Sequence, residues 1–272
     1  MKVLRIVILI LFVFVTIAAT TVFVSEKLSV DKTIPQITVD GDMIEVSLKA
    51  TDEEILKGIT AFDEKDKDLT DKIVIESVSR FISKGVSKVI YAVCDSDNNV
   101  AKATRLIKYK DYESPKFEVI DNLCFSLYEH IDISEHIVAY DSLEGNIKGK
   151  IVVTSDNYST SIPGVYSLDA TVTNSKGDTS TIRLPLIVED VPLSAPKIEL
   201  SEYLVYVKKG QTIDFASYIV DAIDYQEMSL KDRITIESMV DFNKPGSYSV
   251  HYYVTDSLSV RGHSVLTVIV GE

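Results

Sequence analysis

The sequence carries few side chains whose type and spacing could do chemistry, and the clearest group is an acidic run in the first third of the chain. Within "AFDEKDKDLTDK" (residues 61–72), aspartates recur every two or three positions, at Asp63, Asp66, Asp68 and Asp71. Ca²⁺ is bound by about six to eight oxygen atoms, many of them from carboxylates. The spacing of an EF-hand loop is absent, so the run predicts a solvated turn, with a calcium site as the alternative for this loop alone.

The spacing of the four histidines argues against a zinc site. If "EHIDISEH" (residues 129–136) is extended, His130 and His136 lie about 20 Å apart at roughly 3.3 Å per residue, too far to share one ion. His251 and His263 are expected on neighbouring strands of a terminal hairpin, but the sequence shows no third ligand for them. We therefore predict surface or turn histidines and nominate no metal ligand.

Two cysteines, Cys94 and Cys124, raise the question of a disulfide. Cys94 is expected where a strand meets the turn "DSDNN" (residues 95–99), and Cys124 in the first strand of the following domain. Export would expose both to oxidising conditions, but the length of a domain separates them. We therefore predict two free, partly packed thiols.

The sequence lacks the common catalytic signatures. It contains no G-x-S-x-G, H-E-x-x-H, P-loop or G-x-G-x-x-G pattern. Neither cysteine has a plausible histidine partner in the sequence for nucleophilic catalysis. We nominate no catalytic, cofactor-binding or metal residue, and predict that the chain is not an enzyme and carries no cofactor.

The N-terminus predicts export of everything that follows it. Residues 6–24 contain no charged side chain, and about 20 apolar residues are enough to cross a bilayer as a helix. Lys2 and Arg5 precede this run and favour a cytoplasmic N-terminus. We predict an uncleaved signal anchor over residues 1–30; the alternative is a signal peptide cleaved after Ala18 or Ala19.

The amino-acid composition argues against a disordered chain and against nucleic acid as a partner. Of the 272 residues, 46% are hydrophobic, which is enough for packed cores and argues against disorder. The 28 lysines and arginines are outnumbered by 41 acidic residues, and the net charge of -13 disfavours nucleic acid as a partner.

The elements that position these residues occur three times along the chain. "SKGVSKVIYAVCD", "IPGVYSLDATVTN" and "KPGSYSVHYYVTD" align on Gly85, Gly164 and Gly246, at intervals of 79 and 82 residues. The openings "PQITV", "PKFEV" and "PKIEL" begin at residues 35, 115 and 196. Shared landmarks at one period indicate tandem copies of one unit. We place the copies at residues 34–112, 113–191 and 195–272 and name them domains 1, 2 and 3.

Alternation within the repeated stretch predicts strands. Every second residue from Tyr248 to Val254 belongs to one face of a strand. A polar turn and a second alternating strand, "SVLTVIV" (residues 264–270), complete a hairpin, and a short helical turn is expected only at residues 52–58. Several strands in about 80 residues predict an all-β chain of three tandem immunoglobulin-like sandwiches after the N-terminal helix. We expect the opposite face of the hairpin's first strand to be exposed to solvent, without forming a binding patch. Its residues are Ser249, His251, Tyr253 and Thr255.

The copies resemble the bacterial immunoglobulin-like domains of Gram-positive surface proteins, which are related in style to hyalin-type repeats. The residues that carry the resemblance are "GVYSL" (164–168) and "GSYSV" (246–250), which are similar to the tyrosine-corner strand of such sandwiches. Antibody domains have a disulfide cysteine two residues after that tyrosine. The resemblance implies that Leu168 and Val250 pack there instead, and domain 1 departs from the pattern with Ser87 in place of the tyrosine.

These features predict a non-catalytic, membrane-anchored surface protein that serves as a binding or adhesion module. The expected partner is a surface protein or a cell-wall polysaccharide. One alternative is a structural spacer or scaffold for envelope machinery without a soluble ligand, and another is an accessory subunit of a cell-wall enzyme. We expect a single-pass protein of the cell membrane with extracytoplasmic domains, or a secreted protein if the N-terminal segment is cleaved.

Overall fold

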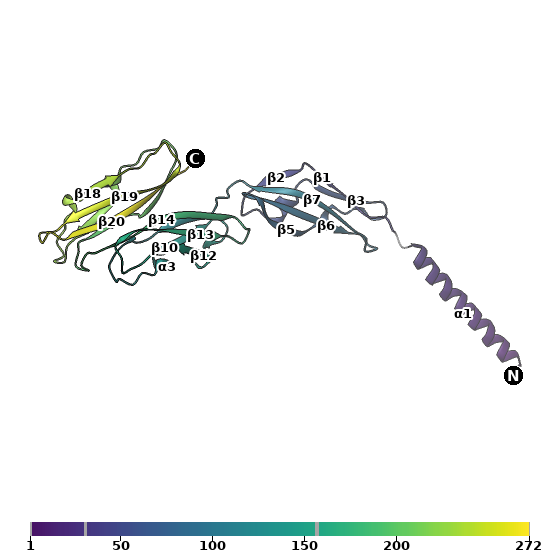
Figure 1. The fold of residues 1–272 in the computed structure, drawn as a ribbon. Helices are drawn as coiled ribbons and strands as arrows, with labels where there is room; N and C mark the ends of the chain where they lie inside the picture. The colour runs from purple at the N-terminus through teal and green to yellow at the C-terminus, as the bar shows by residue number, and fades with distance from the viewer. Residues whose placement is uncertain (1, 30–31, 156–157, 272) are drawn as a thin grey trace. The chain divides into compact units, whose positions relative to one another are not determined.

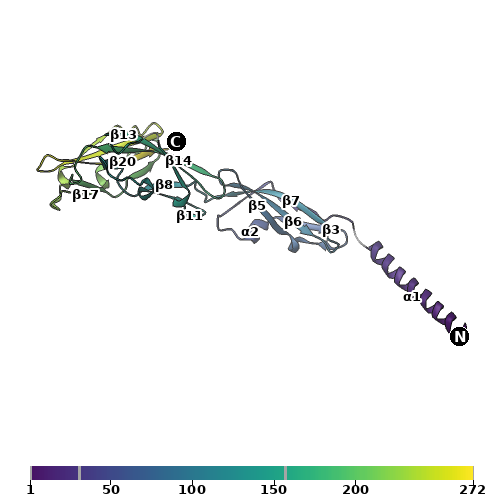
Figure 2. The same cartoon turned by 60° about the horizontal axis from the view of Figure 1, so that its bottom comes forward.

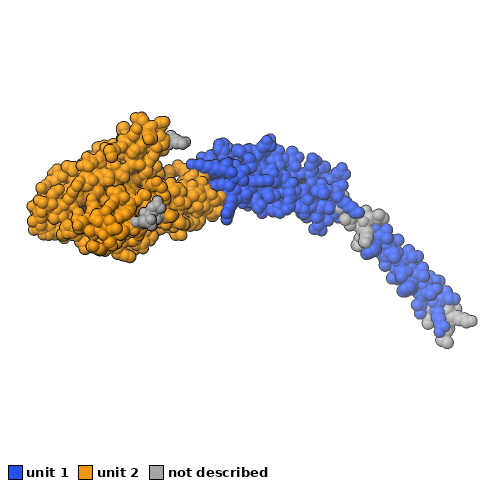
Figure 3. All heavy atoms as spheres, in the orientation of Figure 1, with its two compact units in different colours: residues 1–110 blue, residues 111–272 orange. Residues whose placement is uncertain are grey.

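The computed structural model describes residues 2–29, 32–155 and 158–271. The chain divides into two compact units, Met1–Lys110 and Asp111–Glu272 (Figure 3). Unit 1 contains the N-terminal helix and domain 1, and unit 2 contains domains 2 and 3. Beyond the N-terminal helix, every long element in the described residues is a strand, which confirms the predicted all-β architecture.

The N-terminal helix is α1 (Lys2–Ser29; Figure 1). Its segment Arg5–Val24 has a mean hydropathy of 2.9 and no buried residue. Three hydroxyls interrupt this segment, but Thr16, Thr20 and Thr21 each donate to a carbonyl oxygen three or four residues earlier, at 2.8–3.0 Å. Such bonds satisfy a hydroxyl where no water is present. The helix is therefore long and apolar enough to cross a membrane.

Domain 1 is a sandwich of two layers. One layer has the strand order β1-β3-β4 and the other β2-β7-β6-β5, with β2 parallel to β7 and the remaining pairs antiparallel. Side chains from both layers form its core, in which Val89, Tyr91 and Ile107 are fully enclosed. The bounds of the elements are β1 (Gln36–Val39), β2 (Met43–Val46), α2 (Asp52–Leu56), β3 (Ile59–Asp63), β4 (Lys67–Asp68), η1 (Thr70–Lys72), β5 (Val74–Ser83), β6 (Val86–Cys94) and β7 (Val100–Tyr109).

The short helix α2 is the helical turn expected at residues 52–58. It begins with a capping box in which Thr51 Oγ1 accepts from the amide of Glu54 at 3.4 Å, while Glu54 Oε2 accepts from the amide of Thr51 at 3.1 Å. The other end is held by Arg105 of β7. Nη2 of this buried guanidinium donates to the carbonyls of Ile55 and Lys57 at 3.2 and 2.9 Å.

Domains 2 and 3 repeat the strand order of domain 1, except that the described part of domain 3 has no strand equivalent to β4. In domain 2 the layers are β11-β10-β8 and β12-β13-β14-β9, and in domain 3 they are β15-β17 and β16-β20-β19-β18. In each, a short strand pairs parallel with the last strand, as β2 does with β7. This common order is the physical basis of the sequence repeat.

The elements of unit 2 have the following bounds: β8 (Lys116–Val119), β9 (Cys124–Ser126), α3 (Ile133–His136), β10 (Ile137–Asp141), β11 (Gly145–Asn146), η2 (Lys148–Lys150), β12 (Ile151–Ser155), β13 (Gly164–Thr173), β14 (Thr179–Glu189), β15 (Lys197–Leu200), β16 (Leu204–Val207), η3 (Phe215–Tyr218), β17 (Ile219–Ile223), η4 (Lys231–Arg233), β18 (Thr235–Ser238), β19 (Gly246–Thr255) and β20 (Arg261–Val270).

Tyr166 and Tyr248 have the geometry of a tyrosine corner. Each hydroxyl donates to the backbone carbonyl four residues earlier, at 2.8 Å for Tyr166 and 2.9 Å for Tyr248. The tyrosine ring lies over the glycine two residues before it, since a Cβ added to Gly164 or Gly246 would meet the ring at 3.4 Å. Glycine at this position therefore leaves room for the ring.

The positions that hold a disulfide in antibody domains are filled by aliphatic side chains here. Leu168 and Val250 are both fully buried, which is the packing that the family resemblance implied. Domain 1 has Ser87 where the other two domains have the corner tyrosine. The hydroxyl of Ser87 is buried and donates to the carbonyl of Ser79 at 3.1 Å.

Domains 2 and 3 lie side by side, with β14 beside β19 and β9 beside β20 (Figure 1, Figure 2). Their buried residues belong to one continuous apolar cluster. As a result β20 is buried on both faces, with Val265 and Leu266 1% and 0% exposed. The outer face of β19 was expected to be exposed, but it is half-buried at Ser249, His251 and Tyr253 because domain 2 packs against this side.

Candidate functional site

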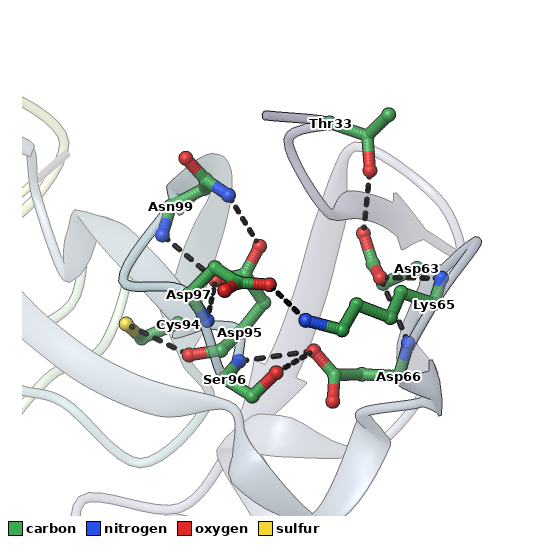
Figure 4. Close-up of polar contacts among 9 residues, drawn as sticks. All are labelled: Thr33, Asp63, Lys65, Asp66, Cys94, Asp95, Ser96, Asp97 and Asn99. Carbon is green, nitrogen blue, oxygen red and sulfur yellow. Dashed lines mark hydrogen bonds and ion pairs between the residues drawn. The ribbon is translucent and has the colours of Figure 1, made fainter. Parts of the chain in front are cut away.

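The structure brings two of the four predicted acidic residues of domain 1 into one cluster (Figure 4). Asp63, at the end of β3, is 2% exposed, and its Oδ1 accepts from the amides of Lys65 and Asp66 at 2.8 and 2.9 Å. Asp66 Oδ2 accepts from the amide and the hydroxyl of Ser96, both at 2.9 Å, and these bonds lower the pKa of Asp66. The cluster therefore joins the predicted loop to the turn between β6 and β7.

The other two aspartates of the acidic run lie outside this cluster: Asp68 is hydrogen-bonded within the next turn, and Asp71 faces solvent. Asp68 Oδ1 accepts from the amide of Thr70 at 2.9 Å, and Asp71 is exposed in η1. The predicted set of four carboxylates therefore does not converge. Among the described residues no group of three or more histidine, cysteine, aspartate or glutamate side chains is placed to hold a metal ion.

The turn that meets this loop contributes a second buried carboxylate, Asp95. It is 6% exposed, and its Oδ1 accepts from the amides of Asp97 and Asn99 at 2.9 and 2.8 Å. Its Oδ2 accepts from Nδ2 of Asn99 at 2.8 Å, while Asp97 forms an ion pair with Lys65 (Figure 4). Each carboxylate of this end of domain 1 thus has its own donor.

The same two positions are buried and polar in all three domains. One follows or ends the third strand of the repeat, and the other begins the turn of the long hairpin. All six residues are between 2% and 6% exposed. The sequence repeat contains this signal in its "AFD", "AYD" and "AID" segments and in its "VCD", "VTN" and "VTD" segments. The pairs are Asp63 and Asp95, Asp141 and Asn174, and Asp224 and Asp256.

In domain 2 the two side chains of the pair are hydrogen-bonded to each other. Asp141 Oδ1 accepts from the amides of the following turn, and Asn174 Nδ2 donates to Asp141 Oδ2 at 2.9 Å. Asn174 Nδ2 also lies 2.9 Å from the hydroxyl of Tyr112, which donates to Asp178 Oδ2 at 2.6 Å. Burial and the Asp178 carboxylate raise the pKa of Tyr112 well above its usual range, so the hydroxyl stays protonated.

In domain 3 both members are carboxylates. Asp224 Oδ1 accepts from the amides of Gln226 and Met228, at 2.8 and 2.9 Å. Asp256 Oδ1 accepts from the amides of Leu258 and Val260, both at 2.8 Å. The remaining oxygen of Asp256 is buried and has no hydrogen-bond partner in the described part of the chain.

A second polar cluster lies between domains 2 and 3. His251 and His263 are on neighbouring strands, as predicted, and Nδ1 of His251 lies 2.9 Å from Nε2 of His263. Nδ1 of His263 lies 3.0 Å from Oε1 of Glu189 in domain 2. A carboxylate can only accept, so His263 carries its hydrogen on Nδ1, and its Nε2 accepts from His251 when both rings are neutral.

This arrangement shifts two pKa values. Burial, followed by the neighbouring His263, lowers the pKa of His251. The hydrogen bond from His263 lowers the pKa of Glu189. Asn122 of domain 2 adds a bond from Nδ2 to the carbonyl of His263 at 2.9 Å. The sequence identified the histidine pair but not Glu189, which is 74 residues from His263 and reaches it only through domain packing.

The other two histidines do not form a site. The segment that contains them was expected to be extended, but it turns through α3, so the predicted separation of about 20 Å does not apply. His130 is exposed, and His136 is half-buried with its Nδ1 3.9 Å from a carboxylate oxygen of Asp121.

Both cysteines are free, as predicted. Cys94, at the end of β6, is exposed and not partly packed as expected. Cys124 is half-buried and lies in β9, the second strand of domain 2 and not the first. Burial, with a smaller effect of Glu189, raises the pKa of the Cys124 thiol well above its usual value.

Comparison with known proteins supports the family resemblance. Residues 201–270, most of domain 3, match the family described as bacterial surface protein, Ig-like domain. The chain is 29% identical over 146 residues to an uncharacterized 81.3 kDa protein of Acholeplasma phage L2, covering 52% of this chain and 19% of that protein. It is 31% identical over 137 residues to the pesticidal crystal protein Cry22Aa of Bacillus thuringiensis, covering 48% and 18%. The chain thus spans less than a fifth of the curated relatives it matches.

Among solved structures, Drosophila N-cadherin EC1-3 is similar over 85% of this chain and 98% of its own, with 13% identity and a TM-score of 0.35. The M60 catalytic domain with two CBM51 domains of Clostridium perfringens ZmpB is similar over 87% and 30%, with 14% identity and a TM-score of 0.24. At these scores no function is transferred from either protein. The predicted resemblance to bacterial surface Ig-like domains is confirmed by the match at residues 201–270.

Proposed function

We propose that the chain is a non-catalytic module displayed outside the cell, anchored in the membrane by α1, that binds a surface protein or a wall polysaccharide. The observation that carries this proposal is an exposed apolar helical segment, Arg5–Val24, in a chain whose domain 3 matches a bacterial surface family. An apolar helix of this length needs either a membrane or a protein partner to cover it.

The state of the polar side chains supports a non-catalytic role. The buried aspartates at the domain ends accept hydrogen bonds from backbone amides of their own turns. The histidine pair between domains 2 and 3 is bound to Glu189. A nucleophile needs an adjacent base, and neither cysteine is hydrogen-bonded to a histidine in the described contacts. We therefore propose no catalytic role for these groups.

The packing of domains 2 and 3 supports the alternative of a structural spacer. It partly covers the outer face of β19 at Ser249, His251 and Tyr253, which would otherwise be fully available to a ligand. A binding surface would then lie in the exposed loops or at the sheet edges, such as β12, where Val152 is 63% exposed. The two functions predict different binding: a binding module binds its partner saturably, whereas a spacer binds no partner.

The test is co-sedimentation of the full chain, reconstituted in fluorescent proteoliposomes, with protein-stripped cell wall of the producing organism. Liposomes without protein are the matched control. Saturable sedimentation at physiological salt supports a wall-polysaccharide partner. If the wall does not bind, crosslinking in intact cells follows, and a single saturable crosslinked protein supports a protein partner. Absence of both contradicts the binding function and favours the spacer.

A further inference from the structure

The end of domain 3 contains two buried carboxylates where domain 2 contains a carboxylate and an amide. In domain 2, Oδ1 of Asn174 accepts from the amides two and four residues later, both at 3.0 Å. In domain 3, Oδ1 of Asp256 accepts from the amides at the same two positions at 2.8 Å. Matching backbone bonds fix both side chains in the same orientation. Oδ2 of Asp256 therefore takes the position that Nδ2 occupies in Asn174.

That position points at the other member of the pair. In domain 2, Nδ2 of Asn174 donates to Oδ2 of Asp141 at 2.9 Å. In domain 3, Asp224 stands in place of Asp141, and its Oδ1 is likewise bound by amides of its own turn. By this match, Oδ2 of Asp256 is aimed at Asp224. Consistent with this, Oδ2 of Asp256 is buried and without a hydrogen-bond partner among the described residues, and the whole residue is 4% exposed.

Domain 1 shows how two carboxylates are accommodated when donors are present. Asp95 Oδ2 accepts from Nδ2 of Asn99 at 2.8 Å, and Asp63 Oδ2 accepts from the hydroxyl of Thr33 at 3.4 Å. The residue of domain 3 equivalent to Asn99 is Val260, whose side chain has no donor. The side-chain amides of Asn99 in domain 1 and Asn174 in domain 2 are thus replaced in domain 3 by Val260 and Asp256, neither of which has a side-chain amide.

A buried carboxylate without a donor is unfavourable, and two that face each other are more so unless a positive charge lies between them. We propose that Asp224 and Asp256 form a divalent-cation site at the end of domain 3, with Ca²⁺ as the ion. Ca²⁺ takes oxygen ligands and tolerates irregular geometry. The exposed loops at residues 225–229 and 257–259 lie directly after the two carboxylates, so their backbone carbonyls and water are the further oxygen ligands that the site would use.

The affinity expected for this site is low. No group of three or more acidic, histidine or cysteine side chains in the described residues is placed around one ion, so two carboxylates carry the charge. Extracellular calcium modules have dissociation constants of about 10⁻⁴–10⁻³ M, and this site is expected in that range. The site does not depend on the proposed partner of the chain.

The experiment compares thermal unfolding of the full chain in detergent micelles with and without 10 mM CaCl₂, after removal of metal by a chelator. The midpoint of the unit 2 transition is expected to rise by about 3–6 °C with calcium. In Asp256→Asn the amide recreates the pair of domain 2, so the calcium shift is expected to disappear while the calcium-free midpoint stays or rises. Asp241→Asn, which makes the same charge change at an exposed side chain of domain 3, is the matched control and keeps the shift.

A second variant and a second probe keep the test decisive. If Asp256→Asn does not fold, Asp224→Asn places the amide on the other side of the pair and is expected to lose the shift. Emission of bound Tb³⁺, excited through tyrosine, gives a readout independent of stability. Ca²⁺ is expected to displace Tb³⁺ from the wild type and reduce this emission, and the folded variant is expected to show no emission. A wild type without a calcium shift, or equal shifts in Asp256→Asn and Asp241→Asn, would overturn the proposal.

Discussion

Nδ2 of Asn174 donates to Oδ2 of Asp141 at 2.9 Å and closes the buried polar pair at the end of domain 2. Of the six side chains at the two repeated positions, Asn174 is the one amide. Its second contact, 2.9 Å to the hydroxyl of Tyr112, ties the segment that precedes domain 2 to the same pair. The chemistry of one residue therefore decides whether this end of a domain is closed by its own hydrogen bonds.

Replacement of Asn174 by Asp is expected to lower the free energy of unfolding by about 2–4 kcal/mol at pH 7, because a buried donor becomes a second buried carboxylate. Urea unfolding of the full chain in micelles, followed by circular dichroism, measures the loss. Asn146→Asp is the matched control, because Asn146 is exposed and its Oδ1, which accepts from the amide of Lys148 at 2.9 Å, is retained. Equal midpoints for the two variants would contradict the role of the pair.

Acid is expected to weaken the contact between domains 2 and 3, and His251 is responsible for the first part of the effect. Its pKa is lower in the folded chain than the ordinary 6.5, so the unfolded chain binds a proton more readily. Stability is therefore complete above pH 6.5 and falls as the pH decreases below that value. Glu189, whose pKa is also lowered, adds a further loss below its ordinary 4.5.

The groups that face His251 are His263, Glu237, Glu189 and Arg261. Thermal midpoints of unit 2 between pH 7.5 and 5 measure the effect, and His251→Gln is expected to flatten this profile at a cost of about 1 kcal/mol at pH 7. His130→Gln changes an exposed histidine and is expected to leave the profile unchanged. An undiminished pH dependence in His251→Gln would contradict the assignment.

Arg105 is expected to be the most important charged side chain in the fold of domain 1. Its guanidinium is 4% exposed and donates to the carbonyls of Asp40, Ile55 and Lys57 at 2.9–3.2 Å. Arg105→Ala is expected to destabilise unit 1 by about 3 kcal/mol, because the three hydrogen bonds and the packing of a buried side chain are lost. Hydrogen exchange of amides in α2 reports the loss. Exposed Arg80 is the control, and a loss of protection as large in Arg80→Ala would refute this role.

The sequence predicted the fold because the repeat and the alternation of buried residues act locally. Tyr166 and Tyr248 bond only four residues back, and Leu168 and Val250 lie on the inner face of their own strands. These contacts depend on spacing along one strand, which a single sequence displays.

The contacts that were not predicted join residues far apart in the chain. Glu189 meets His263 only because domain 3 packs against domain 2. A sequence signal for this packing exists in "SVLTVIV" (residues 264–270), where an almost continuous apolar run is typical of a strand buried on both faces. The acidic run of domain 1 has a local explanation: Asp63 and Asp68 accept hydrogen bonds from backbone amides of their own turns, so their spacing reflects turn formation.

The two cysteines provide a test of export that needs no added label. Cys94 is exposed, whereas the Cys124 thiol is half-buried with a raised pKa and reacts slowly because little thiolate forms. A membrane-impermeant maleimide is therefore expected to label the full chain in intact cells through Cys94, with Cys94→Ser losing the label and Cys124→Ser keeping it. Because α1 contains no cysteine, the label reports on domain 1. Labelling that appears only after lysis would place domain 1 inside the cell and contradict the proposed anchor.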